Sequence, residues 1–173
     1  MAHGVHLSRP ERQVLADRGT SIAHCPLSNM FFANGILPVA TILATHQSKM
    51  ALGTDVAGGY SLSMLSAMRM AVIAHHAATP MRQNTTVAVT KTIVIDYKVA
   101  FWLATLGGAR AVGLGSVIGS FVRGKAFDAL WINPTSAPID RFPQDTTSTL
   151  FQKFLHQGDS RHIQRRFVRG NEV

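Results

Sequence analysis

Three polar side chains occupy positions where a chain of alternating strands and helices places reactive groups. His3, His24 and Asp55 each end or follow a short apolar run. A carboxylate at a strand end can bind a metal ion or take a proton from a metal-bound water. An imidazole can bind a metal or orient a polarised substrate atom. Alone, such residues are more often turn or core residues, so the evidence lies in their combination.

Strand and helix signals alternate over the first half of the chain. Met1–Gly4 has the character of a strand end, Thr20–Cys25 of a buried strand stopped by Pro26, and Lys49–Thr54 of a second strand that leads into Asp55. Helices are expected from a capping box at Ser8 to Gly19, over Ile36–His46, and over Ser61–Ile73. This alternation predicts parallel β/α units, whose strands all end at one edge. We therefore expect His3, His24 and Asp55 to share one polar pocket.

The second half changes from helical to strand signals. Asp96 is expected to cap a helix over Tyr97–Ala104, and a shorter helix is expected to end at Gly113. Residues 80–96 are expected to connect the halves, 134–149 to form a loop, and Phe151–Gln157 to be helical. A small separate sheet is predicted from three segments, namely Gly119–Val122, Asp128–Asn133 and Arg166–Val173.

Composition limits the classes of protein this chain can be. Of its 173 residues, 46% are hydrophobic and 15% charged, which excludes an unstructured chain. The net charge is +8, but its one dense basic cluster, Arg161–Arg169, accompanies no nucleic-acid-binding motif and is expected to be a solvated face. Cys25 is the only cysteine, which favours a reducing compartment. With no signal peptide and no run of about 20 apolar residues, the expectation is a cytoplasmic protein with no nucleic-acid or membrane partner.

Five strings give the sequence a more specific meaning. They are Met-Ala-His-Gly-Val-His-Leu-Ser at 1–8, Ala-His-Cys-Pro-Leu-Ser-Asn at 23–29, Gly-Thr-Asp-Val-Ala-Gly-Gly-Tyr-Ser at 53–61, Leu-Ala-Thr-Leu-Gly-Gly-Ala-Arg-Ala-Val-Gly-Leu at 103–114, and Ile-Gly-Ser-Phe-Val-Arg-Gly-Lys-Ala-Phe-Asp-Ala-Leu at 118–130. In this order they resemble the C-terminal portion of the guanine deaminases, a family of the amidohydrolase superfamily.

The resemblance implies an α/β fold with the last three strands of a (β/α)₈ TIM barrel in residues 1–115 and part of a small β-sandwich domain in 116–173. It implies zinc-dependent hydrolysis of guanine to xanthine and ammonia by a homodimer. Asp55 matches a catalytic carboxylate that binds one zinc ion and accepts a proton from the attacking water. His3 matches a catalytic histidine that contacts that water or the tetrahedral centre, whereas His24 matches a packing or supporting position.

Two motifs of the family are absent from the sequence. None of the eight histidines belongs to a His-x-His pair, and neither Glu11 nor Glu172 lies three residues after a histidine. The expectation is therefore a truncated chain that lacks the first five barrel strands and is inactive alone. Three alternatives stay open: a non-catalytic fragment that associates with the intact enzyme, an amidohydrolase acting on another ring such as a pterin or adenosine derivative, and a basic nucleic-acid binder.

Overall fold

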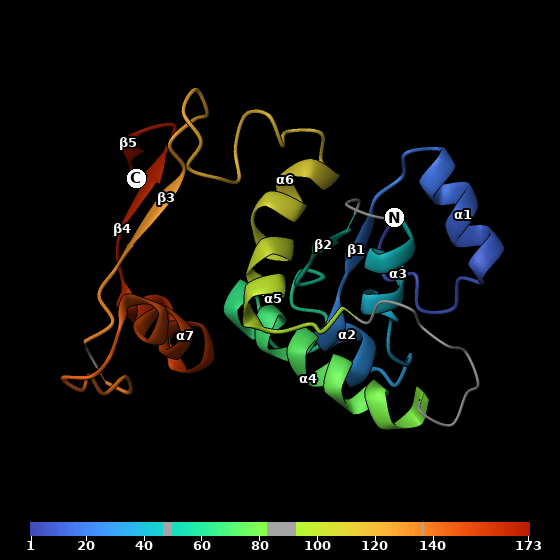
Figure 1. The fold of residues 1–173 in the computed structure, drawn as a ribbon, viewed down its shortest axis with the longest axis horizontal. Coiled ribbons are helices and arrows are strands. Elements are labelled where there is room, and N and C mark those ends of the chain that lie inside the picture. The colour runs from blue at the N-terminus through green and yellow to red at the C-terminus, as the bar shows by residue number, and fades with distance from the viewer. Residues whose placement is uncertain (47–49, 83–92, 136) are drawn as a thin grey trace.

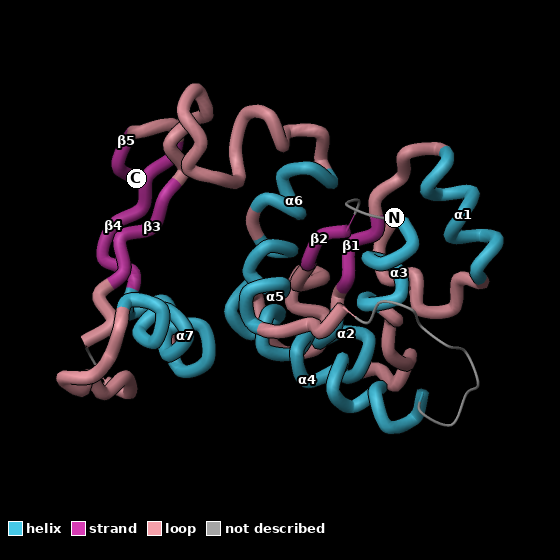
Figure 2. Tube along the Cα trace, in the orientation of Figure 1, coloured by secondary structure: helices cyan, strands magenta, loops and turns pink. Residues whose placement is uncertain are grey.

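The protein is an α/β structure in which short strands alternate with helices (Figure 1). A computed structural model describes residues 1–46, 50–82, 93–135 and 137–173. Most of the expected 80–96 connector lies outside these residues. Within them, one sheet is parallel and the other antiparallel. The strands of the two sheets lie on opposite sides of the view in Figure 2.

The parallel sheet joins three segments that are adjacent along the first half of the chain. β1 (Ile22–His24) pairs in parallel with β2 (Met50–Leu52), with Ile22 opposite Met50 and His24 opposite Leu52. On the other side of β1, Ala2 forms a parallel bridge with Ala23. The expected neighbouring parallel strands are thus confirmed, each shorter than its apolar run.

Helices cover the parallel sheet in the places that the sequence indicates. α1 (Arg9–Asp17) starts with the expected capping box between Ser8 and Glu11. α3 (Val39–His46) precedes β2, and α5 (Tyr97–Ala104) and α6 (Leu106–Ala111) pack against β2. Asp96 caps α5 by accepting hydrogen bonds from two backbone amides, those of Lys98 and Val99. These contacts bury an apolar core centred on Met50, Ile95 and Leu103.

α4 differs in extent from the helix expected over Ser61–Ile73. It runs over Met64–Arg82, and the Ser61 hydroxyl accepts a hydrogen bond from the amide of Ser63 before the helix begins. The helix continues because alanine, the strongest helix former, recurs along it. Ala67, Ala71 and Ala74 are buried on its inner face. No helix in the described parts of the chain is long and apolar enough to cross a membrane.

The second sheet contains two of its three expected segments. β3 (Ala129–Ile132), β4 (Ile163–Val168) and β5 (Asn171–Glu172) pair in antiparallel fashion in that order. The prediction of a strand over Gly119–Val122 is wrong. Gly119 has φ +87° and lies so close to α6 that a Cβ there would be 2.7 Å from that of Ala109. The ammonium of Lys125 donates to the carbonyl of Ile118 at 3.2 Å, which holds the segment as a loop.

α7 (Thr147–Gln157) joins the C-terminal region to the core. It begins four residues before the expected helix, because the Thr146 hydroxyl accepts a hydrogen bond from the amide of Thr149. A short 3₁₀ helix (Ser160–His162) leads from α7 into β4. The guanidinium of Arg69 on α4 donates to the carbonyl of Leu155 at 2.8 Å and also to that of Gly158. Arg69 therefore ties α4 to the end of α7.

We predict that Arg69→Met lowers the free energy of unfolding by about 1–3 kcal/mol, because charged hydrogen bonds to two carbonyl groups are lost. Arg18→Met is the matched control, since Arg18 is exposed at the end of α1 and should change stability by less than about 0.5 kcal/mol. Urea unfolding of both variants measures the difference. Equal unfolding free energies of the two variants would show that the hydrogen bonds of Arg69 to α7 contribute nothing to stability.

Candidate active site

Asp55 follows β2 and lies at the carboxyl end of the parallel sheet. Its side chain is 37% exposed. Its Oδ2 accepts a hydrogen bond from the hydroxyl of Ser28 at 2.7 Å. The carboxylate is therefore held in one orientation while part of it stays accessible, as a metal ligand or proton acceptor requires.

His3 ends the segment on the far side of β1 and faces the same carboxylate. Its Nε2 lies 3.7 Å from Asp55 Oδ2, and its Nδ1 is hydrogen-bonded at 2.8 Å to Oδ1 of Asn29. The separation of 3.7 Å is too long for a hydrogen bond, yet a single water can touch both atoms. The side chain of His3 is 39% exposed. The structure thus brings together the two residues that the sequence singled out as catalytic.

A short helix that the sequence analysis missed supplies both supporting contacts. α2 (Pro26–Phe31) lies between the expected strand that stops at Pro26 and the expected helix over Ile36–His46, and its first four residues are buried. Ser28 and Asn29 are adjacent on it, and one reaches Asp55 while the other reaches His3. Six residues are too few for a helical periodicity to be visible. The available signal was Pro26, because proline is favoured in the first turn of a helix.

The backbone at the site is held in a conformation that costs free energy. His3 has φ 63°, and Asp55, Val56 and Ala57 have φ 55°, 49° and 64°. Residues with a side chain adopt this left-handed region infrequently, and such strain persists where surrounding structure imposes it, commonly at functional sites. Here the left-handed conformation occurs at both candidate residues, which follow the first and the third of the parallel segments.

Gly58 permits the turn after β2 to fold back against the carboxylate. A Cβ at this position would lie 2.5 Å from Asp55 Oδ2 and 3.0 Å from the Ser28 hydroxyl. The next residue, Gly59, has φ +112° and lies against Leu27 of α2. The Gly-Gly pair thus lets the backbone close over the contact between Ser28 and Asp55.

Cys25 follows β1 and is buried beside the site. The residue is 3% exposed, and a Cβ on Gly53 would lie 3.1 Å from its sulfur. Burial raises the pKa of the thiol, and the nearby charge of Asp55 raises it further. The side chain is consequently a protonated thiol at neutral pH rather than a nucleophile.

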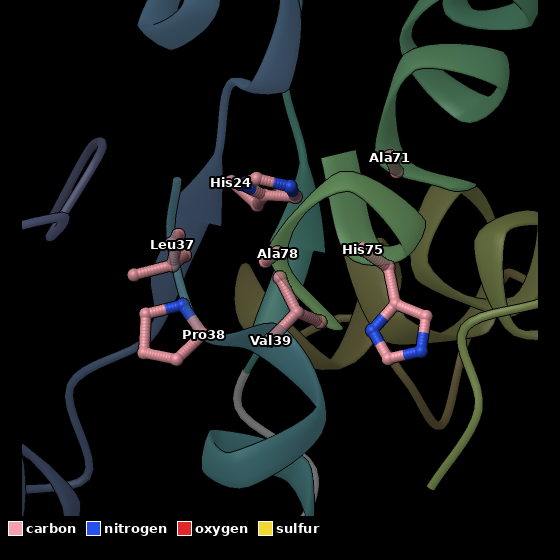
Figure 3. Close-up of a pocket in the computed structure, with 7 residues that line it drawn as sticks. All are labelled: His24, Leu37, Pro38, Val39, Ala71, His75 and Ala78. Carbon is pink, nitrogen blue, oxygen red and sulfur yellow. The ribbon is translucent and has the colours of Figure 1, made fainter. Parts of the chain in front are cut away.

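His24 does not share the pocket of the other two residues. It is 1% exposed, and it lines a separate cavity of about 20 Å³ between β1, the segment before α3, and α4 (Figure 3). Its Nδ1 has no hydrogen-bond partner among the described residues. Burial lowers the pKa of His24 to about 4, so the ring is neutral at pH 7. This placement agrees with a packing role.

A zinc ion would find part of a binding site here. Asp55 and His3 are a carboxylate and an imidazole, both of which zinc accepts. The described residues contain no group of three or more histidine, cysteine, aspartate or glutamate side chains able to hold a metal. Tight binding needs three or four protein ligands, so these residues fit one portion of the coordination sphere only.

Known proteins resemble the chain along its whole length. The family model described as "Amidohydrolase family" matches residues 1–173. Guanine deaminase of Mus musculus is 46% identical, and that of Homo sapiens 45% identical, each over 100% of this chain. The chain spans 38% of the length of both relatives.

Solved structures resemble the fold as well. A guanine deaminase from C. acetobutylicum with bound guanine in its active site has a TM-score of 0.84 at 31% identity, covering 100% of this chain and 38% of that one. An adenosine deaminase from Xanthomonas campestris with bound zinc has a TM-score of 0.78 at 27% identity, covering 99% of this chain and 36% of that one.

The close approach at Gly58 predicts the effect of a single methyl group. Gly58→Ala forces the Asp55 carboxylate or the Ser28 hydroxyl to move and should lower stability by about 1–3 kcal/mol, the usual cost of overpacking. Gly108→Ala is the control, because its Cβ would meet only an ordinary contact at 3.5 Å inside α6. Urea unfolding compares the two, and a neutral Gly58→Ala would contradict the described packing.

Burial of His24 predicts a pH dependence of stability. The unfolded chain protonates this ring near its usual pKa of 6.5, but the folded chain does so only near 4. Because the unfolded state then binds more protons, stability is full above pH 6.5 and falls by about 3 kcal/mol as the pH drops to 4.

Replacing the ring should remove that part of the pH dependence. We expect His24→Phe to be less sensitive to acid between pH 6.5 and 4 than the unaltered chain. His76→Gln, at an exposed position of α4, should keep the original slope. Unfolding free energies measured across this pH range test the difference. Identical slopes of stability against pH in all three proteins would rule out His24 as the origin of the acid sensitivity.

Proposed function

Since the chain belongs to the amidohydrolase family, we propose that it forms part of a zinc-dependent aminohydrolase that converts guanine to xanthine and ammonia. The observation that carries this proposal is the meeting of His3 and Asp55, 3.7 Å apart, at the ends of the two parallel segments that flank β1. Identity of 45–46% to guanine deaminases over the whole chain supports the choice of guanine.

We propose that the three parallel segments are the last three strands of a (β/α)₈ barrel. Their order along the sheet follows the order of the chain, and helices separate them in sequence. Barrels of this kind carry their active sites at the carboxyl ends of the strands, where His3 and Asp55 lie. Residues 1–115 would then form the barrel portion, and residues 116–173, with the antiparallel sheet, part of a second, β-sandwich domain.

Asp55 would serve as a zinc ligand and as the acceptor of a proton from the attacking water. Zinc, when bound, lowers the pKa of a coordinated water toward neutrality. The hydrogen bond from Ser28 occupies Oδ2, and the carboxylate is partly exposed. These contacts keep the group accessible without allowing it to rotate freely.

His3 would bind the water beside Asp55 or stabilise the charge that develops when the ring is attacked. Its Nε2 points toward Oδ2 of the carboxylate, and its Nδ1 is bonded to Asn29. His24 would support the strand through packing only. The remaining zinc ligands would come from residues beyond those that the structure describes, and one ion per site is proposed.

We also propose an assembly and a cellular location for the protein. A homodimer is expected for the whole enzyme from the resemblance to guanine deaminases. The one cysteine, Cys25, is an unpaired and buried thiol, which suits the reducing cytoplasm.

Two other functions have a specific observation in their favour. The likeness to an adenosine deaminase keeps another ring substrate open. Leu130 and Trp131 on β3 are 53% and 58% exposed, which favours association with a further copy or domain. Comparing ammonia release from guanine, adenosine and a pterin decides the first question, and sedimentation of the chain mixed with a full-length relative decides the second.

We expect the chain alone, supplied with zinc, to release no ammonia from guanine, because its described residues offer one carboxylate and one imidazole to the metal. Mixed with the complementary N-terminal portion of a guanine deaminase, it should gain activity. Asp55→Asn should then reduce the rate by a factor of about 10² or more, since a general base and a ligand are both lost.

Asp17→Asn is the matched control, because Asp17 is exposed on α1 and its side chain accepts a hydrogen bond from Gln13 of the same helix. This variant should retain the activity of the mixture. Turnover of guanine by the chain alone, abolished in Asp55→Asn, would show that the further ligands are unnecessary. Full activity of Asp55→Asn in the mixture would overturn the role of Asp55.

A further inference from the structure

The contact between Asn29 and His3 determines which nitrogen of the histidine is free. Asn29 Oδ1 lies 2.8 Å from His3 Nδ1, and an amide oxygen can only accept a hydrogen bond. The hydrogen of this bond must therefore be on Nδ1. We propose that Asn29 is a positioning residue that holds neutral His3 in the Nδ1–H tautomer, with the lone pair of Nε2 directed at the reaction centre.

The amide of Asn29 is enclosed, and its contact with His3 is the hydrogen bond that its side chain makes to a described residue. The residue is 1% exposed on α2, and its Nδ2 has no hydrogen-bond partner among the described residues. Leaving a buried donor unpaired is costly, and such exceptions call for an explanation in the native structure. The proposed role of Asn29 accounts for this one, because an amide oxygen held on Nδ1 fixes the tautomer and the orientation of the His3 ring.

The backbone of His3 removes the remaining freedom of the ring. The amide of His3 donates to the carbonyl of Ala23 at 2.9 Å, and its φ of 63° is fixed in the left-handed region. With Cα anchored to β1 and Nδ1 anchored to α2, Nε2 is left beside Asp55 Oδ2. The ring is thus held from two different elements of the fold.

This arrangement gives the pair of residues a shared chemical property. In the Nδ1–H tautomer, both Nε2 of His3 and Oδ2 of Asp55 are acceptors, and they lie 3.7 Å apart. They cannot bond to each other, but they can accept the two hydrogens of a single water molecule. In the opposite tautomer, Nε2–H would present a donor to the carboxylate and compete with the water for it. Asn29 therefore keeps both acceptors available to the water that the proposed hydrolysis consumes.

The catalytic meaning of this inference rests on the proposed function, but the tautomer itself is a property of the chain. Long-range ¹H–¹⁵N NMR spectra of the ¹⁵N-labelled chain, recorded without metal or guanine, distinguish a protonated ring nitrogen from an unprotonated one. Spectra recorded at increasing pH select the conditions in which the ring carries a single proton. His3→Gln identifies the signals by their loss.

We expect His3 of the unaltered chain to show Nδ1 protonated and Nε2 unprotonated. Asn29→Ala should abolish this preference and give a mixture of tautomers, whereas Asn29→Asp, which keeps the Oδ1 acceptor, should restore it. Ser28→Ala is the matched control, since Ser28 contacts Asp55 and not His3. That variant should leave the tautomer of His3 unchanged.

An Nε2–H tautomer in the unaltered chain would overturn the inference, whatever the behaviour of the Asn29 variants. An unchanged single tautomer in a folded Asn29→Ala would overturn it as well. Failure of the proposed function is a separate result, because it would appear as a lack of ammonia release from guanine by the complemented enzyme while the His3 spectrum stayed as expected.

Discussion

Parallel pairing of residues 1–3, β1 and β2 is the constraint on which the site depends. The amide of His3 donates to the carbonyl of Ala23, and the amide of Gly53 donates to the carbonyl of His24. These hydrogen bonds set the register, so that the chain leaves each segment at the same edge of the sheet. His3 and Asp55, separated by about 50 residues of sequence, meet there because their segments flank one central strand.

A second constraint comes from α2, which leaves β1 at this edge and packs under both candidate residues. Because Ser28 and Asn29 are consecutive and buried, their separation is fixed by the helix backbone. They contact Asp55 and His3 respectively. The geometry of the pair is therefore set by rigid elements, with the close approach of Gly58 completing the enclosure.

The charged and neutral groups at this edge are separated by burial. His24 is enclosed, which keeps it neutral, and the Cys25 thiol is kept protonated by burial and by the charge of Asp55. Asp55 and His3 stay more than a third exposed. Solvent access thus distinguishes the residues able to meet a substrate from those that only support the strands, although all four lie within a few residues of a strand end.

The sequence by itself predicted the parallel strands, most of the capped helices and a polar site at the strand ends, because hydrophobic periodicity, capping chemistry and the motif strings are local features. It did not predict α2, the length of α4 or the loop at Gly119. Those depend on packing between distant segments: Ser28 against Asp55, buried alanines against the core, and Gly119 against Ala109. Which of the strand-end histidines reaches Asp55 was likewise decided by tertiary structure, because burial of a side chain depends on every element packed around it.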